Sequence, residues 1–420
     1  MSTNVFVRPT PPQRRVVVTG MGLITPLGLN VEDSWKGLVQ GKSGIGPITQ
    51  FDASTYDARI AGEIKGFNAD LYVPKKEQKK MDRFIQLSLA AAKMALDDSQ
   101  FKAEDTSRVG TVVGVGMGGL PFIETQYSIL KERGPGRVSP FFIPSVITNM
   151  AAGQISMAYG FRGPNYCVTS ACASGAHALG EAAEFIRSGR CDVMIAGGAE
   201  AVVTPMAIAG FSSMRALSTR NDNPAVASRP WDRDRDGFVL SEGVALLILE
   251  DYEYASQRGA RIYAELCGYG TSSDAYHMTS PSPGGAGAAQ AMSYCLEDAR
   301  VGPDQVDYIN AHGTSTPAGD ELETEAVKKV FGDHAKSLWI SSTKSMIGHT
   351  LGAAGAVESV ICIQALTTSI VPPTINLDHP SPDCDLDYVP KTAREKKMKY
   401  ILNNSFGFGG TNCSLLFGQV

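Results

Sequence analysis

The chain has 420 residues, of which 43% are hydrophobic and 19% are charged, and this composition is typical of a globular protein with a large buried core. Its net charge of −5 argues against nucleic acid as a main partner. The eight cysteines form neither CxxC pairs nor a zinc-finger spacing, which argues against a disulfide framework and a metal site and suits a reducing compartment.

No run of 18 or more apolar residues is present, so we expect no membrane insertion. The N-terminal segment lacks the apolar core of a signal peptide, and residues 1–13 are predicted to be a flexible tail. We therefore expect a cytoplasmic protein.

Short β-branched runs alternate with segments of helical periodicity and with glycine-rich turns, which predicts an α/β fold with buried strands. In chain order we predict a strand at 15–20, a helix at 84–99, a strand at 108–114, a helix at 173–188 and a strand at 191–197. The segment 218–235 is rich in Asn, Pro and Arg and is expected to be an ordered surface excursion.

A similar order of segments occurs twice. In the first half, the turn TSACASGA opens a helix, and a strand ending at Gly197–Gly198 and a returning strand at 243–250 follow. In the second half, GHTLGAAGA opens a helix at 355–366, and YILNNS, GFGG and NCSLLF follow. The repeat predicts two similar halves, residues 14–255 and 256–420, with a reactive group near each helix start facing a shared cleft.

Cys172 lies within TSACASGA, between a predicted strand and a predicted helix. A thiol at a helix N-terminus is close to unpaired backbone amides and to the positive end of the helix dipole, which favour the thiolate. Its alanine, serine and glycine neighbours leave room for an acyl chain at the sulfur. We predict that Cys172 is a nucleophile and that the other seven cysteines are structural.

Two histidines have sequence contexts that suit a reactive site. His312 follows the predicted strand VDYIN, and His349, in KSMIGHTLG, precedes a predicted helix. Each is expected to follow a strand end, among glycines and hydroxyl groups, where an imidazole can reach a cleft. A single such histidine is more often structural, but two of them beside a poised cysteine favour nucleophilic catalysis.

Two segments imitate unrelated binding motifs. Residues 114–119 fit GxGxxG after a strand, but no compact βαβ unit with a following acid is present, so we expect no nicotinamide site. Asp232, Asp234 and Asp236 resemble the start of a calcium loop. Glu242 falls one place early for that loop and arginines interrupt it, so no metal site is predicted.

Five segments together resemble the β-ketoacyl-[acyl carrier protein] synthases of the thiolase-like superfamily, with bacterial synthase II as the nearest branch: TSACASGA, NAHGTSTPAGD, STKSMIGHTLGAAGAVE, RPWDRDRDGFVLSEG and NSFGFGGTN. The resemblance covers nearly everything from Arg15 to Phe417. A histidine at position 349 is similar to the Cys-His-His branch, whereas synthase III and plant polyketide synthases have asparagine there. The resemblance implies a thiolase-like α/β fold of two related halves, each with a mixed sheet, in stacked helix and sheet layers. It also implies a homodimer in which the partner helps to close the acyl pocket.

The resemblance further implies a decarboxylative condensation in fatty acid elongation. Cys172 would accept an acyl group from the carrier, and malonyl-carrier would then lose carbon dioxide and attack the acyl-cysteine. His312 and His349 would stabilise the enolate as neutral hydrogen-bond donors, and the backbone amides of Cys172 and Phe408 would bind the later oxyanion. No metal or cofactor is expected beyond the 4'-phosphopantetheine arm of the acyl carrier protein.

Further residues take their expected roles from the same resemblance. Lys344 and Glu358 match a buried ion pair that would orient the histidines, with a surface lysine and a helix carboxylate as the alternative. Thr314 and Thr316 resemble threonines that bind the pantetheine amides, and Met117 matches a position at the acyl pocket.

Two further expectations concern a turn and a charged segment. Glycines flank Phe408, so its ring could gate the acyl tunnel, and a rigid turn with a packed ring is the alternative. The segment VPKKEQKKMDRF carries four lysines: Lys75, Lys76, Lys79 and Lys80. A charged run of this kind is usually a solvated helix face, but we favour a docking site for an acidic acyl carrier protein. Arg133 and Arg137 add positive charge elsewhere.

Three other functions stay open. A ketosynthase for polyketides or specialised acyl products would use the same three side chains. A non-catalytic chain-length partner would share the fold but lack the nucleophile, which is present here. A cysteine hydrolase would need only one cysteine–histidine pair and water, which leaves the second histidine unexplained.

Overall fold

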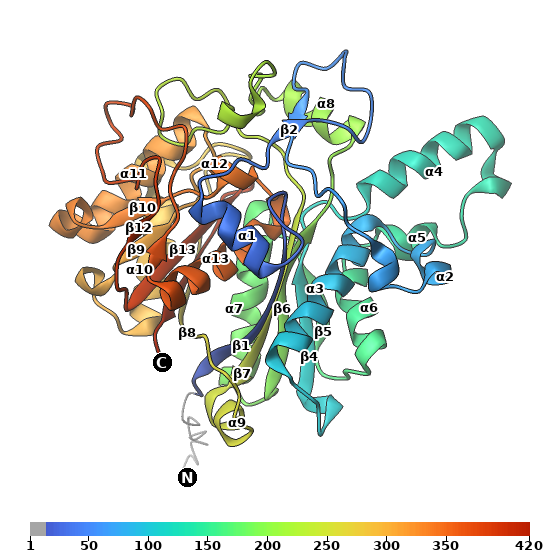
Figure 1. Ribbon diagram of the computed structural model, residues 1–420, viewed down its shortest axis with the longest axis horizontal. Helices are drawn as coiled ribbons and strands as arrows, with labels where there is room; N and C mark the ends of the chain where they lie inside the picture. Colours follow the sequence, from blue (N-terminus) through green and yellow to red (C-terminus); the bar gives the residue numbers. More distant parts are fainter. Residues whose placement is uncertain (1–13) are drawn as a thin grey trace, which may run out of the picture.

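The computed structural model describes residues 14–420 (Figure 1), so the predicted tail at 1–13 lies outside the described residues. Ten strands of the described part form one mixed sheet in the order β10-β9-β13-β14-β8-β1-β7-β6-β4-β5. Their bounds are β1 (Val16–Ile24), β4 (Val109–Gly114), β5 (Asn165–Val168), β6 (Val193–Glu200), β7 (Gly243–Asp251), β8 (Ala264–Ser273), β9 (Tyr308–Asn310), β10 (Trp339–Ser341), β13 (Tyr400–Gly407) and β14 (Thr411–Gly418).

The sheet consists of two five-strand groups with the same topology. In the first group, β1 and β6 each pair antiparallel with β7, and β4 pairs parallel with both β6 and β5. In the second group β8, β14, β13, β9 and β10 repeat these positions and directions. Only Val17 and Val18 of β1, paired with Glu265 and Ala264, join the groups. The predicted fold of two related halves with mixed sheets is confirmed, and the two sheets are continuous through β1 and β8.

Helices complete the layers. Figure 1 shows α7 (Ser174–Arg187) and α13 (Ala354–Thr368) between the two strand groups. Outside the first group lie α3 (Arg83–Ser99) and α6 (Met150–Tyr159), and outside the second lie α10 (Ala286–Ala299) and α11 (Pro317–Phe331). Three apolar clusters fill the spaces between these layers, and the largest surrounds α7 and α13. Nearly all of α13 is therefore buried, whereas α7 leaves Glu184 exposed.

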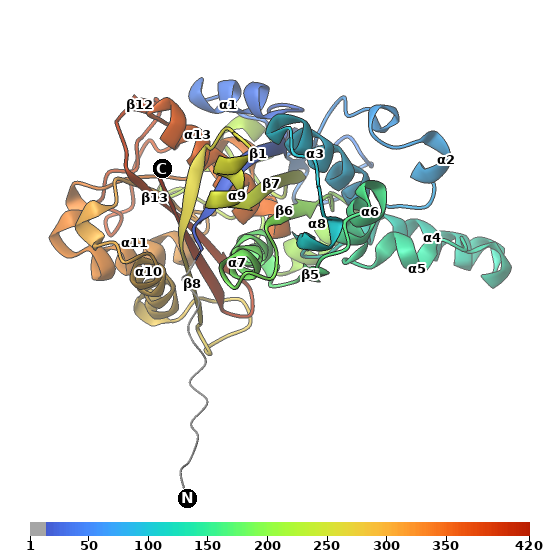
Figure 2. The same ribbon diagram turned by 90° about the horizontal axis from the view of Figure 1, so that it is seen from below.

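Shorter elements surround these layers. They are α1 (Val31–Val39), α2 (Lys75–Gln78), α4 (Leu120–Arg133), α5 (Phe142–Val146), α8 (Pro205–Ser213), α9 (Tyr252–Gln257), α12 (Lys344–Ile347), β2 (Gly46–Pro47), β3 (Ile60–Ala61), β11 (Ile370–Val371) and β12 (Arg394–Glu395). Figure 2 shows α2, α4 and α5 at one end of the molecule and β12 at the opposite end. The predicted boundary between residues 255 and 256 falls inside α9, and the division itself stays a prediction.

The predicted elements are present, with shifts of a few residues at their ends. The strand predicted at 191–197 is β6, which begins two residues later and ends at Glu200. The surface excursion predicted at 218–235 is wrong in part, because residues 227–232 and Arg235 are buried. Its arginines can be buried because they form ion pairs with neighbouring carboxylates.

One helical segment of the described residues, Leu351–Thr368, is long and apolar enough to cross a membrane, although polar residues such as Glu358 interrupt it. However, 83% of it is buried within the protein. A helix that is apolar all round is what a position between two sheets requires. The segment is the central helix α13 with the turn before it.

Candidate active site

The two central helices begin in the same way. Ala171 (φ +49°) and Leu351 (φ +46°) both have left-handed backbone, and each opens a short 3-10 helix that leads into α7 or α13. The two helix starts are in close contact, since a Cβ on Gly175 would lie 3.0 Å from the Gly352 carbonyl oxygen. Cys172 lies in the 3-10 helix before α7, and His349 lies two residues before the 3-10 helix that leads into α13.

A cavity of about 530 Å³ opens at this junction. Its lining includes seven of the residues predicted from sequence: Met117, Cys172, His312, Thr314, Thr316, His349 and Phe408. These residues come from five separate segments of the chain. Tertiary structure therefore brings the predicted nucleophile, both histidines and the predicted arm-binding threonines together in one space.

The two histidine rings lie edge to face, with centroids 5.4 Å apart. Burial lowers the pKa of both rings well below the ordinary value, and the nearby positive charge of Lys344 lowers it further. Both imidazoles are therefore neutral at neutral pH. Within the described chain, neither ring nitrogen of His349 nor Nδ1 of His312 has a hydrogen-bond partner. These nitrogens remain available for a ligand.

The backbone positions of the histidines differ from expectation in one case. His312 follows the end of β9, as predicted. His349 does not directly follow a strand, because the short helix α12 separates it from β10. Gly348 (φ +71°) ends α12, and the backbone N–H of His349 donates to the Val239 carbonyl at 2.8 Å. This bond fixes the ring next to the loop that precedes β7.

Lys344 and Glu358 form a hydrogen-bonded ion pair, and each side chain is only 1% exposed. The alternative of a surface lysine and an isolated helix carboxylate is therefore wrong. Neither group hydrogen-bonds to a histidine in the described chain, so the pair acts on the imidazoles through its field. Burial raises the pKa of Glu358 to about 7, and the charge of Lys344 opposes that rise.

Cys172 is 8% exposed, and its burial raises the pKa of the thiol to about 12. The charge of Lys344 and the backbone N–H groups of Phe408 and Cys172 itself act in the opposite direction. Burial therefore opposes the thiolate that was expected at the helix start, because desolvation outweighs the nearby donors. The protonated thiol is the form of Cys172 that burial favours.

The turn Gly407–Gly410 lies against the Cys172 loop. Gly409 (φ +87°) and Gly410 (φ +71°) adopt backbone angles that favour glycine. The Thr411 hydroxyl donates to the Ser170 carbonyl at 3.0 Å and fastens the turn. The amides of Phe408 and Cys172 both lie close enough to the sulfur to lower its pKa. This is the arrangement expected of two oxyanion donors.

Glu200 was not predicted from the sequence, yet it is fully buried beside the nucleophile. Its carboxylate accepts the N–H groups of Gly116, Met117, Gly118 and Gly352 at 2.8–3.2 Å. The GxGxxG-like segment thus forms an anion-binding nest that the protein's own carboxylate fills. Burial raises the pKa of Glu200 to about 7.

Glu323 was also missed. Its carboxylate accepts the backbone N–H groups of His312 at 2.9 Å and Gly313 at 2.8 Å, which holds the His312 loop against α11. The position of both buried carboxylates depends on contacts between segments distant in the sequence. In the sequence, the only signal for Glu200 is that it is a charged residue among apolar neighbours, and Glu323 lies among other charged residues.

The remaining predicted residues are placed as follows. The hydroxyls of Thr314 and Thr316 lie 3.0 Å apart on the cavity wall. Lys75, Lys76 and Lys79 are exposed on and next to α2. Lys80 instead pairs with Glu77 at 2.8 Å and lies over the Phe141 ring, so it is a weaker docking candidate than expected. The structure describes no group of three or more metal-ligating side chains in residues 14–420.

Two family models match the chain, the beta-ketoacyl synthase N-terminal domain over residues 13–255 and the C-terminal domain over residues 263–378. The 3-oxoacyl-[acyl-carrier-protein] synthase 2 of Vibrio harveyi is 54% identical over 411 residues, covering 97% of this chain and 99% of that protein. The corresponding protein of Synechocystis sp. is 49% identical over 407 residues, covering 96% and 98%.

Solved structures give the same result. A chain from the complex of a type II polyketide acyl-carrier protein with its ketosynthase is similar at a TM-score of 0.90 and 36% identity, covering 97% of this chain and all of that one. A beta-ketoacyl synthase from Burkholderia phymatum has a TM-score of 0.90 and 37% identity at the same coverage.

Proposed function

The chain belongs to the beta-ketoacyl synthase family, and from this we propose that it is a 3-oxoacyl-[acyl-carrier-protein] synthase of fatty acid elongation that works through Cys172, His312 and His349. The observation that carries the proposal is the convergence of one buried thiol and two neutral, unpartnered imidazoles in a single cavity. A hydrolase would have no use for the second imidazole.

The first half-reaction transfers the acyl group. The Cys172 sulfur attacks the thioester carbonyl of acyl-carrier, the bond from that carbonyl to the arm sulfur breaks, and the thiol proton passes to the departing arm thiolate. Negative charge on the carbonyl oxygen is held by the N–H groups of Cys172 and Phe408. Because the resting thiol is protonated, deprotonation accompanies attack, which limits side reactions of a free thiolate.

The second half-reaction forms the carbon–carbon bond. Malonyl-carrier loses carbon dioxide, and the electron pair of that bond leaves an enolate whose oxygen accepts hydrogen bonds from His312 and His349. The enolate carbon attacks the acyl-cysteine carbonyl, and the same two amides hold the new oxyanion. Collapse expels the Cys172 thiolate, which takes up a proton from water to restore the thiol. Burial, together with the positive charge of Lys344, keeps both imidazoles neutral, so that each donates a hydrogen bond as an uncharged ring.

The partner is an acyl carrier protein, and its 4'-phosphopantetheine arm reaches the sulfur past Thr314 and Thr316. The carrier in the related solved complex supports this assignment. The proposal needs no cofactor beyond that arm. It includes a homodimer as the working form and the cytoplasm as the location. A polyketide ketosynthase is the less favoured alternative, because identity falls from 54% for the synthase 2 relative to 36% for the polyketide complex.

The test is the acyl adduct on the nucleophile. Cys172→Ala incubated with acyl-carrier should gain no acyl mass and give no condensation product, while its circular dichroism spectrum stays that of the wild type. Cys167→Ala, a half-buried cysteine five residues away, is the matched control and should acylate normally. An acyl adduct that persists in Cys172→Ala would overturn the proposal.

A further inference from the structure

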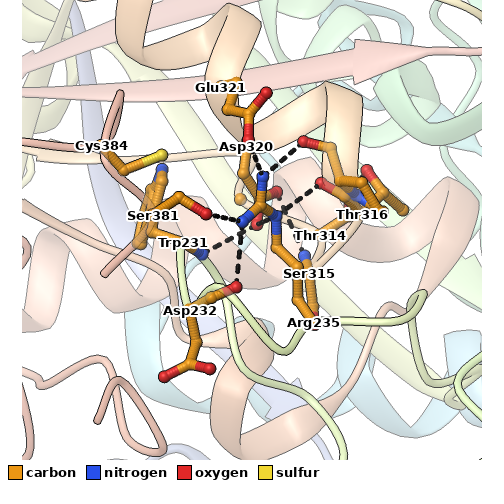
Figure 3. A network of polar contacts seen from close by, with 12 residues as sticks. Trp231, Asp232, Arg235, Thr314, Ser315, Thr316, Asp320, Glu321, Ser381 and Cys384 are labelled. Atoms are coloured by element: carbon orange, nitrogen blue, oxygen red, sulfur yellow. Dashed lines mark hydrogen bonds and ion pairs between the residues drawn. The ribbon is translucent and has the colours of Figure 1, made fainter. Parts of the chain in front are cut away.

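A buried polar network connects the segment 228–237 to the loop that carries Thr314 and Thr316 (Figure 3). Arg235 lies at its centre, with a side chain only 2% exposed. It comes from the RPWDRDRDG segment, for which neither the sequence nor the condensation chemistry supplies a role. Arg235 does not line the cavity.

All five N–H donors of the Arg235 guanidinium have acceptors. They donate to the carbonyl oxygens of Thr316 (3.1 Å), Pro317 (2.5 Å) and Asp232 (2.9 Å), to the Ser381 hydroxyl (2.6 Å) and to the Glu321 carboxylate (2.7 Å). A planar guanidinium matches these five directions at once, and a lysine ammonium has only three donors. The two carbonyls of Thr316 and Pro317 belong to the start of α11, at the cavity wall.

The same network holds the residue between the two threonines. Ser315 is fully buried and has φ +71°, a conformation that serine adopts only when its surroundings impose it. Asp320 accepts its N–H at 3.2 Å, Gly237 donates to its carbonyl at 3.1 Å, and the Arg229 amide donates to its hydroxyl at 2.9 Å. Asp320 is in turn 3.5 Å from the Arg235 guanidinium.

These contacts bracket the two threonine hydroxyls, which lie 3.0 Å apart and face the cavity. A loop with a strained residue at its centre and no buried anchor would sample several positions, and hydrogen bonds to an entering amide would then cost more ordering entropy. Of the groups that hold the loop, Arg229, Arg235 and Ser381 do not line the cavity, whereas Asp320 does. The Thr314 and Thr316 hydroxyls are therefore preorganised by contacts to the loop backbone and to Ser315.

We propose that Arg235 is a positioning residue for the carrier arm: it fixes Thr314 and Thr316 where they receive the amides of a pantetheine thioester. The inference rests on the proposed function and adds to it a residue that acts on substrate binding without touching substrate. It predicts that Arg235 matters only for thioesters whose thiol part carries amide groups.

The test compares two small substrates. Acylation of Cys172 by hexanoyl-pantetheine and by S-ethyl thiohexanoate, which lacks the arm amides, is followed by intact mass. Arg235→Lys should lower the rate constant for the pantetheine thioester about tenfold and leave that for the ethyl thioester within about twofold. Arg233→Lys is the matched control, because that arginine lies in the same segment with its side chain 61% exposed, and it should change neither rate.

A double-mutant cycle separates positioning from general damage. In a Thr314→Ala/Thr316→Ala background, Arg235→Lys should cause no further loss with the pantetheine thioester, because the groups it positions are absent. Equal losses with both thioesters, no loss with either, or a full additional loss in the threonine-free background would overturn the inference. If the wild type acylates Cys172 with neither thioester nor with acyl-carrier, it is the proposed function that fails.

A milder variant covers the case in which Arg235→Lys does not fold. Ser381→Ala removes one acceptor, 2.6 Å from the guanidinium, and leaves the charge in place. It should lower the pantetheine rate alone by about threefold. An unchanged ratio of the two rates in this variant would likewise contradict the inference.

Discussion

Cys172 combines limited exposure with groups that stabilise negative charge only once it develops. Burial keeps the thiol protonated, while two backbone amides and the charge of Lys344 favour the anion. The two histidines are neutral for the same reason that the thiol is, since burial disfavours charge on any of the three side chains. At the residue scale, charge therefore appears during the reaction in a buried site and is stabilised by fixed dipoles.

Met117 belongs to the same scale, because one side chain is expected to set the acyl chain length. It lines the cavity with Cys172, and its backbone N–H is held by Glu200 at 3.1 Å, so the side chain alone can adapt. Methionine is unbranched and flexible, and we expect medium and long acyl chains to be accepted. Met117→Phe should lower Cys172 acylation by long chains about tenfold and leave the shortest acyl groups nearly unaffected.

The measurement is the acylation rate against chain length for both proteins. Parallel loss at every length would mean general damage to the site. No change at any length would place Met117 outside the acyl pocket.

At the scale of elements, the turn Gly407–Gly410 joins β13 to β14 and presents both an amide and a ring to the sulfur. The Phe408 side chain is partly exposed, whereas two hydrogen bonds hold the turn next to it. The Gly409 amide donates to the Met278 carbonyl at 2.7 Å, and Thr411 binds Ser170. A ring on an anchored turn can move while the amide stays.

Phe408→Ala tests whether that ring gates the acyl tunnel. The variant keeps the backbone N–H, so a role limited to the oxyanion would leave acylation unchanged. We expect acyl transfer to slow about tenfold and discrimination between acyl and malonyl thioesters to fall. Single-turnover acylation with each thioester is the measurement. Wild-type rates and selectivity would rule out the gate and leave a packed ring on a rigid turn.

The helix α2 is the second element with a predicted role. Lys76→Glu/Lys79→Glu should raise KM for carrier-bound substrate roughly three- to tenfold at low salt and weaken its salt dependence, because opposite charge is lost at the docking surface. The matched control is Lys397→Glu/Lys399→Glu, an equal charge change on exposed lysines between β12 and β13. Figure 2 shows β12 at the end of the molecule opposite to α2. Unchanged carrier kinetics in the α2 variant, or the same change in both, would place docking elsewhere.

For the whole molecule, the decisive contact is the one between the two halves at the starts of α7 and α13. Small residues allow the helices to approach until a Cβ on Gly355 would lie 2.6 Å from the Ala176 Cβ and 2.7 Å from its backbone nitrogen. This close packing places Cys172 of one half beside His349 of the other. The catalytic geometry is therefore a property of the packing between halves and of neither half alone.

Gly355→Ala should destabilise the fold by about 1–3 kcal/mol, because the added methyl group overpacks backbone that cannot move away. Gly210→Ala is the control, since its Cβ in α8 would meet nothing within 4 Å, and it should be neutral or slightly stabilising. Urea unfolding of both variants is the measurement. A Gly355→Ala protein as stable as the wild type would show that the helices separate without cost.

Local sequence patterns were enough to predict the family, the repeated strand and helix order, and Cys172, His312 and His349 as the candidate reactive residues. These follow from short local patterns, since Cys172, His312 and His349 each stand in a contiguous motif of small and polar residues. Tertiary structure alone decided the rest. Glu200, Glu323 and Arg235 act through contacts with segments far away in the chain, which no local pattern records. The protonated state of Cys172 and the pairing of Lys80 also depend on burial and neighbours, because desolvation and ion pairing are set by the folded environment and not by residue type.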